Sequence, residues 1–104
     1  MTVQSNISTM VQEATQLVRQ IFEPTPCVRN DHLSKKYDAE IWLKREDLTP
    51  VRSYKIRGAV NAMSRARAQN PDLCLFVCAS AGNHAQGVAF ACRHFGVRGV
   101  IFMP

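Results

Sequence analysis

Residues 73–79 form a short apolar run, LCLFVCA, that constrains the fold more than any other feature of the sequence. A run of this length, without polar alternation and bounded by turn residues, is typical of a strand inside a parallel sheet. An amphipathic helical pattern follows it, and residues 97–103 begin a second apolar run. A strand, a helix and a second strand in this order form a crossover unit, which makes the two strands parallel. The chain is therefore predicted to have an α/β fold built on a parallel sheet.

The rest of the chain fits the same fold class. Apolar residues in the segment 7–21 recur at intervals of three and four, which predicts an amphipathic helix that ends before Pro24. Residues 27–30 and 40–46 are predicted strands, with a helical turn at 33–36 between them. The apolar triplet IWL in the second of these strands predicts that both of its faces are buried. Helices and strands therefore alternate along the chain, as parallel crossovers require.

Composition excludes several classes of protein. The chain has 104 residues, which is the length of one domain or less. Hydrophobic residues make up 46% of the chain and charged residues 20%, a composition that predicts a globular protein. No apolar run approaches the ~18 residues of a membrane span, so no membrane partner is expected. Residues 1–9 are polar and lack an apolar signal core, which predicts a cytoplasmic protein. The net charge of +5 comes from scattered basic residues, and only eight residues are aromatic, so no nucleic-acid partner is expected.

The cysteines give no indication of a metal site. The chain contains four of them, and no two have the C-x-x-C spacing of a zinc site or a redox-active pair. Most lie inside apolar segments, so buried, reduced thiols are expected and no metal ion is predicted. The four are Cys27, Cys74, Cys78 and Cys92.

Residues 53–58, with the sequence SYKIRG, lie at a predicted junction between a loop and a helix that runs from Lys55 to about Ala68. Ser53 is the predicted N-cap of this helix. Arg52, Lys55 and Arg57 gather at a helix end that already carries partial positive charge, which favours the neutral form of an amine. A neutral lysine amine is a nucleophile and can form a Schiff base. The alternative, which the spacing leaves open, is a solvated basic helix start without a chemical role.

Residues 80–84, with the sequence SAGNH, follow the carboxyl end of the predicted strand 73–79. Ligands of parallel sheets bind beyond this end of the strands. Free backbone N–H groups at the start of a helix, with serine, asparagine and histidine side chains, suit an anion such as a carboxylate or phosphate. The alternative is an ordinary strand-to-helix turn capped by serine or asparagine. Gly87 follows inside the helix, where glycine costs about 1 kcal/mol relative to alanine, and this indicates a close approach by another group.

Two long segments resemble a known family. LKREDLTPVRSYKIRGA at 43–59 and ASAGNHAQGVA at 79–89 are similar to the threonine dehydratase (threonine ammonia-lyase) group. These are pyridoxal-phosphate enzymes of fold type II, related to serine racemase, serine dehydratase and tryptophan synthase β. The resemblance covers residues 7–104 and implies a three-layer α/β/α fold with a parallel sheet.

The resemblance implies a role for each site residue. Lys55 holds pyridoxal 5′-phosphate as a Schiff base and, once released by the substrate, acts as a base at the α-carbon. Tyr54 packs beside the cofactor ring, and Asn83 makes a hydrogen bond with the hydroxyl group of the ring. The loop that binds the substrate carboxylate consists of Ser80, Ala81, Gly82, Asn83 and His84.

The implied activity is deamination of L-threonine to 2-oxobutanoate and ammonia. The residues PVR before the serine of SYK, in place of a glycine, favour the biosynthetic branch that leads to isoleucine. The alternatives are an L-serine dehydratase, a serine racemase, and a non-catalytic fragment that binds an anion or a partner subunit. The expected ligand is an amino acid, L-threonine or L-serine, and the enzyme is expected to be a homodimer or homotetramer.

Two features of the family are missing from the sequence. Family members carry a glycine-rich loop that holds the cofactor phosphate, and a serine or cysteine that faces the pyridine nitrogen. The five glycines of this chain include no adjacent pair. The expectation is therefore that residues 1–52 open the larger domain and residues 53–104 begin the smaller one, with both incomplete. This segment alone is predicted to be inactive.

Overall fold

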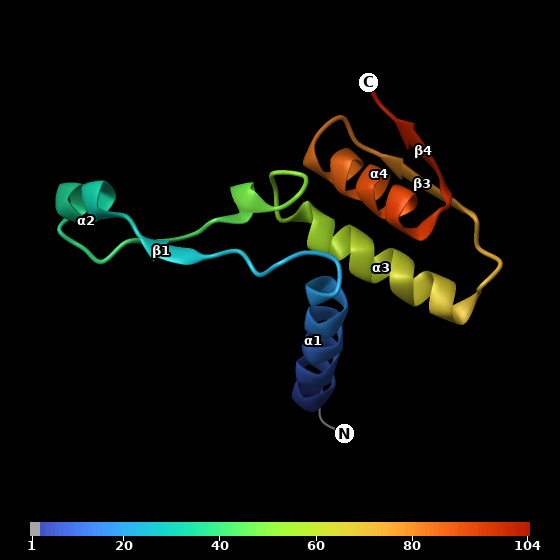
Figure 1. Cartoon of the computed structure of the whole chain (residues 1–104), viewed down its shortest axis with the longest axis horizontal. Coiled ribbons are helices and arrows are strands. Elements are labelled where there is room, and N and C mark those ends of the chain that lie inside the picture. The colour runs from blue at the N-terminus through green and yellow to red at the C-terminus, as the bar shows by residue number, and fades with distance from the viewer. Residues whose placement is uncertain (1–2) are drawn as a thin grey trace.

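The structure is a computed structural model that describes residues 3–104, with side chains from residue 6 onward. Helices and strands alternate through most of the chain, as the sequence predicts (Figure 1). The elements are α1 (Val3–Arg19), β1 (Cys27–Arg29), α2 (Asp31–Tyr37), β2 (Trp42–Lys44), the 3₁₀ helix η1 (Glu46–Leu48), α3 (Lys55–Gln69), β3 (Leu75–Ala79), α4 (Asn83–Phe95) and β4 (Arg98–Phe102).

The second half of the chain is an α/β unit. Strands β3 and β4 pair in parallel, from Leu75 opposite Arg98 to Ala79 opposite Phe102, and α4 connects them. The crossover unit predicted from the two apolar runs is therefore confirmed. Helix α4 ends at Gly96, which has the positive φ of 65° that glycine adopts at little cost.

The core lies between α3 and α4. Ile56 and Val60, one turn apart on α3, are completely buried, and Ala91 of α4 is completely buried opposite them. Small side chains on α4 allow the two helices to approach closely. Phe76 and Cys78 of β3 pack against this core from the sheet. The buried residues of α3 recur at intervals of three and four, as one face of a helix requires, and they are Ile56, Ala59, Val60 and Met63.

The other face of the β3–β4 sheet is exposed. Leu75 and Val77 of β3, and Val100 and Phe102 of β4, have exposed fractions between 38% and 63%. These residues alternate with the inward-facing positions, because successive side chains of a strand point to opposite faces. An exposed apolar face is what the incomplete sheet predicted for this segment would leave. Helices α3 and α4 cover one face, and no other described element covers the second.

The segment with β1, α2 and β2 extends away from α3 and α4 as a separate arm (Figure 1). Strands β1 and β2 pair antiparallel, with Cys27 opposite Lys44, so the expectation of parallel pairing throughout is wrong here. The seven-residue α2 turns the chain back beside β1 and does not cross over a sheet. Trp42 is exposed, so burial on both faces of β2 is also wrong. Helix α1 packs on α3. The radius of gyration is 16.7 Å, against roughly 13 Å for a compact domain of this length.

The cysteines are all free, and burial differs among them. Cys92 is buried and Cys78 is half-buried, but Cys27 and Cys74 are exposed, so the expectation of buried thiols is wrong for these two. Burial raises the pKa of the Cys92 thiol above its ordinary value. None of the helices within the described chain has the length and apolar character needed to cross a membrane.

Candidate active site

Lys55 is the first residue of α3, and Ser53 is not the N-cap that was predicted. The cap position belongs to Tyr54, whose side chain makes no capping hydrogen bond. Thr49, which is buried, fixes the turn instead: its hydroxyl donates to the Ser53 carbonyl at 2.8 Å and accepts from the Ser53 N–H at 3.0 Å. The Ser53 hydroxyl is buried and has no hydrogen-bond partner among residues 3–104. A buried hydroxyl without a partner is costly, so this group is suited to a partner outside the residues described.

The arginines beside Lys55 are occupied by other groups. Arg57 forms a bidentate pair with Glu46, with Nε–Oε2 at 2.7 Å and Nη2–Oε1 at 2.9 Å. Chiefly through this hydrogen bonding, Arg57 lowers the pKa of Glu46 to about 2. Arg52 donates to the Asp47 carbonyl at 3.5 Å. The charge argument for Lys55 therefore has less support than the sequence alone indicated, because one arginine is neutralised by a carboxylate.

The pair between Glu46 and Arg57 also anchors the start of α3 to the first half of the chain. The Thr25 hydroxyl donates to Glu46 and accepts from Arg57 Nη2 at 3.3 Å, and the Lys44 amine donates to the Thr25 carbonyl. The Arg57 guanidinium lies 5.3 Å from the centroid of the Phe22 ring. This cluster joins segments up to 32 positions apart in the sequence, and no local pattern predicts it.

The loop at residues 80–84 follows the carboxyl end of β3, as predicted. The Ser80 N–H donates to the Phe102 carbonyl at 3.0 Å, which holds the loop beside the end of β4. The Ser80 hydroxyl accepts from the N–H groups of Gly82 and Ala85 at 3.2 and 3.3 Å. Ser80 therefore caps the first turn of α4, which agrees with the alternative of an ordinary strand-to-helix turn capped by serine. Its hydroxyl hydrogen remains free to donate to a ligand, because a hydroxyl both accepts and donates.

The first turn of α4 offers further donors. The N–H groups of Asn83 and His84 have no acceptor in the part of the chain that the structure describes, and both side chains are exposed. A Cβ at Gly82 would meet no described atom within 4 Å, so there is open space beside this turn. Unpaired N–H groups and the positive end of the helix dipole favour an anion at this position.

Lys55 and this loop lie at the same end of the α3–α4 pair (Figure 1). A Cβ at Gly87 would lie 3.1 Å from the carbonyl carbon of Lys55, so the second turn of α4 contacts the first turn of α3 directly. The glycine at this position predicted a close approach by another group. The structure confirms this approach, and the approaching group is the backbone of Lys55. The Lys55 amine lies 5.5 Å from the centroid of the Tyr54 ring and forms no ion pair with a described carboxylate.

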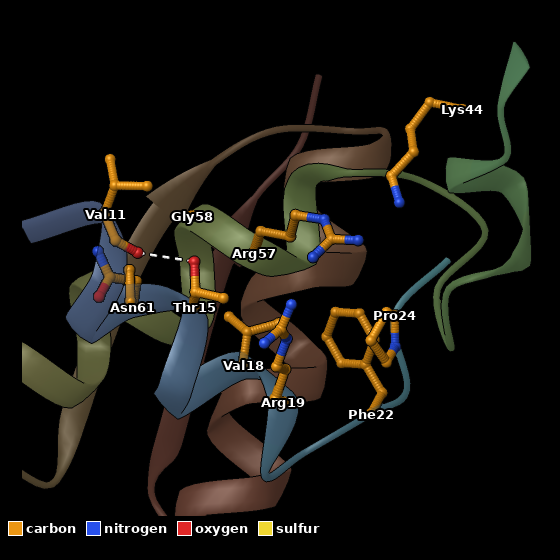
Figure 2. A pocket seen from close by; sticks show the side chains of 11 residues that line it. Val11, Thr15, Val18, Arg19, Phe22, Pro24, Lys44, Arg57, Gly58 and Asn61 are labelled. Carbon is orange, nitrogen blue, oxygen red and sulfur yellow. Dashed lines mark hydrogen bonds between the residues drawn. The ribbon is translucent and has the colours of Figure 1, made fainter. Parts of the chain in front are cut away.

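A cavity of about 390 Å³ lies elsewhere, between α1 and α3 (Figure 2). Its lining includes Val18 and Phe22 from the first half of the chain and Arg57 from α3, but neither Lys55 nor the 80–84 loop. In Figure 2 a hydrogen bond from the Thr15 hydroxyl to the Val11 carbonyl, 2.7 Å long, lies at the opposite end from Phe22. This cavity is therefore separate from the candidate site. Within residues 3–104 no cluster of three or more histidine, cysteine or acidic side chains could hold a metal ion.

Comparison with known proteins identifies the family. Residues 18–104 match the model of the pyridoxal-phosphate dependent enzymes. The chain belongs to this family. It is 51% identical over 94 residues to the biosynthetic L-threonine dehydratase of Bacillus subtilis (strain 168), covering 90% of this chain and 22% of that protein. The chain thus spans about a quarter of the length of the curated relatives that it matches.

Solved structures agree with this assignment. A pyridoxal 5′-phosphate-dependent aspartate racemase matches with a TM-score of 0.84 at 28% identity, covering 90% of this chain and 30% of that one. The processed form of threonine deaminase isoform 2 from Solanum lycopersicum matches with a TM-score of 0.69 at 37% identity, covering 89% and 28%. These neighbours confirm the predicted fold class, a partial α/β domain of pyridoxal-phosphate fold type II.

The residues present fit the family's cofactor, pyridoxal 5′-phosphate. A covalently held aldehyde cofactor needs an amine that no carboxylate occupies, and Lys55 provides one. The unpartnered Ser53 hydroxyl and the free N–H groups at the start of α4 lie on the two segments that adjoin this lysine. The described residues thus include an amine without a carboxylate partner and a set of unpaired donors, and they include no glycine-rich loop for the phosphate.

Proposed function

We propose that this chain is the cofactor-lysine segment of an enzyme that deaminates L-threonine to 2-oxobutanoate and ammonia, the first step of isoleucine biosynthesis. The observation that carries the proposal is the juxtaposition of Lys55 with the 80–84 loop, at the start of two helices in contact through Gly87. The 51% identity to a biosynthetic threonine dehydratase supports threonine as the substrate.

In this proposal each residue of the site has one task. Lys55 binds the cofactor covalently and then takes the proton from the substrate α-carbon on its amine. The cofactor, when bound, supplies a ring system that accepts the electrons of that bond. The Ser80 hydroxyl and the N–H groups at the start of α4 bind the substrate carboxylate. Asn83 makes a hydrogen bond with the hydroxyl group of the ring. Tyr54 packs beside the ring, and its side chain is exposed in the structure and therefore available for this contact.

The proposal extends to the assembly. Residues 1–52 belong to the larger domain and residues 53–104 to the smaller one, which agrees with the arm that β1 and α2 form away from α3 and α4 in Figure 1. The exposed apolar face of the β3–β4 sheet is suited to cover by further elements of the enzyme. The full enzyme is a cytoplasmic homo-oligomer whose substrate is a small amino acid, L-threonine or L-serine.

An amino-acid racemase is the second candidate. Its support is the TM-score of 0.84 to an aspartate racemase, which exceeds the 0.69 to a threonine deaminase. Sequence identity over the aligned residues has the opposite order, at 28% and 37%, and sequence identity bears more directly on chemistry than backbone similarity does. Racemisation and deamination both begin with loss of the α-proton, so they differ in the product and not in the role of Lys55.

The test is a product assay on the full-length enzyme. Purified enzyme with pyridoxal phosphate is given L-threonine, L-serine and D-serine, and both the ketoacid and the enantiomers of the amino acid are measured. We expect 2-oxobutanoate from L-threonine, and no ketoacid from a Lys55→Ala variant. Lys36→Ala is the matched control, because each lysine amine lies over a neighbouring tyrosine ring. The distance to the ring centroid is 5.2 Å for Lys36 and Tyr37, and 5.5 Å for Lys55 and Tyr54. Inversion of serine without ketoacid from threonine would support the racemase instead.

A further inference from the structure

Gly87 lies on the buried face of α4, in the second turn of the helix, where α4 packs on α3. A Cβ atom at this position would lie 3.1 Å from both the carbonyl carbon and the carbonyl oxygen of Lys55, and 3.2 Å from the backbone nitrogen of Ile56. Side-chain atoms seldom come this close to other atoms, and these neighbours belong to the main chain, which cannot rotate away. A side chain at position 87 must therefore shift the backbone of Lys55 itself by a few tenths of an ångström.

This close approach distinguishes Gly87 from the other glycine of the α3–α4 pair. Gly58 also lies inside a helix, but a Cβ there would meet no described atom within 4 Å. Glycine inside a helix lowers helix stability relative to alanine, so both positions carry that cost. At Gly87 the missing side chain allows two helices to touch main chain to main chain, and the point of contact is the candidate cofactor lysine.

The contact joins the two parts of the candidate site. Helix α3 begins with Lys55, while α4 begins within the 80–84 loop, where the Ser80 hydroxyl accepts from the Ala85 N–H. Behind Gly87, the completely buried Ile56 packs in the same core cluster as Val88, so the two helix starts have little room to shift. We infer that Gly87 is a positioning residue, whose missing side chain sets the separation between Lys55 and the 80–84 loop. The inference rests on the proposed role of Lys55.

The consequence is a specific defect when a side chain is added. A methyl group at position 87 shifts the Lys55 backbone relative to the 80–84 loop. The distance between the Lys55 amine and a group bound by the loop then changes. Displacement of about 1 Å can cost a hundredfold in rate, so a shift of a few tenths of an ångström is expected to cost about tenfold. The effect on kcat is expected to exceed the effect on KM, because the loop keeps its own donors for the substrate.

The experiment compares Gly87→Ala, Gly58→Ala and Val88→Ala in the full-length enzyme. Gly58→Ala adds the same methyl group to a helical glycine that has space for it. Val88→Ala removes packing from the same helix interface without adding an atom near Lys55. For each variant we would measure the thermal midpoint of the apoprotein, the dissociation constant of pyridoxal phosphate, and the pH midpoint of the visible band of the bound cofactor, followed by kcat and KM for L-threonine. Borohydride reduction and peptide mapping show whether Lys55 carries the cofactor.

For Gly87→Ala we expect a folded apoprotein, a cofactor dissociation constant raised about tenfold, a shifted pH midpoint, and kcat lowered about tenfold with KM within about twofold. For Gly58→Ala the pH midpoint and dissociation constant stay as in the wild type, and for Val88→Ala the thermal midpoint falls while the pH midpoint stays. The inference is overturned if Gly87→Ala keeps the wild-type midpoint and affinity, if either control shifts them equally, or if Gly87→Ala alone fails to fold. A cofactor mapped to another lysine would instead refute the proposed role of Lys55.

Discussion

Replacing Glu46 with glutamine removes the charge that holds the start of α3 to the first half of the chain. Glu46 is 20% exposed and accepts two hydrogen bonds from Arg57 and one from the Thr25 hydroxyl. The amide of glutamine keeps the size of the side chain but loses the negative charge. Arg57 then stays partly buried without a counter-ion, and its position two residues after Lys55 links this defect to the candidate site.

The size of the effect follows from the pKa of Glu46. Its pKa falls from 4.5 to about 2, which is about 2.5 pH units and corresponds to roughly 3 kcal/mol at 1.36 kcal/mol per unit. Arg57 is 35% exposed, so solvent weakens the pair below that value. We therefore expect Glu46→Gln to lower the free energy of unfolding by about 2 kcal/mol at pH 7.

The pH dependence has a definite sign. A carboxylate whose pKa is lowered on folding stabilises the protein above its unfolded pKa of about 4.5, and this contribution is lost as the pH falls towards 2. The difference in unfolding free energy between wild type and Glu46→Gln is therefore expected to be constant from pH 6 to pH 8 and to shrink below pH 4.5.

The assay is urea unfolding of the full-length enzyme in a double-mutant cycle of Glu46→Gln, Arg57→Gln and the double variant. A coupling energy of about 1.5–3 kcal/mol is expected for a charge-assisted bidentate pair. A coupling energy below about 0.5 kcal/mol, which is the range of exposed ion pairs, would refute the reasoning. So would a wild-type-to-variant difference that does not change between pH 7 and pH 3.

Three further predictions concern the loop and the isolated segment. Ser80→Ala should lower kcat/KM for L-threonine about ten- to hundred-fold with the cofactor still bound, because a hydrogen bond to a charged group contributes roughly 1.5–3 kcal/mol. Wild-type kinetics in this variant would mean that Ser80 acts only as a helix cap. Asn83→Ala should change the visible spectrum of the bound cofactor, and an unchanged spectrum would remove Asn83 from the ring. Residues 1–104 expressed alone should aggregate and form no 2-oxobutanoate, because one face of the β3–β4 sheet is apolar and exposed; a soluble monomer with a cooperative melt and threonine deamination would contradict this.

The sequence predicted the elements where apolar spacing was regular. The buried face of α3 and the parallel pairing of β3 with β4 follow directly from it, because period and order determine both. The antiparallel pairing of β1 with β2 was not predicted, since a three-residue strand carries too little pattern to show its direction. Burial of both faces of β2 was also inferred wrongly, because an apolar triplet indicates a tendency to be buried but does not identify the element that would cover it.

The candidate site was predicted in part. The position of the 80–84 loop at the end of β3, and the need for a close neighbour at Gly87, could be read from local sequence. The roles of Lys55, Tyr54 and Asn83 came from family resemblance and remain predictions. Ser53 was misassigned as the N-cap because Thr49, four residues earlier, bonds to its backbone. The bonds among Thr25, Glu46 and Arg57 join distant segments, which sequence spacing does not reveal.

The central claim is that Lys55 holds the cofactor, and borohydride reduction of the full-length enzyme tests it most directly. Reduction fixes the cofactor to its lysine, and trypsin does not cleave after a modified lysine. Because arginines occupy positions 52 and 57, the account predicts a labelled peptide of residues 53–57, with the sequence SYKIR and the added mass on Lys55. A label on any other lysine, with residues 53–55 and 56–57 recovered as separate unmodified peptides, would contradict it.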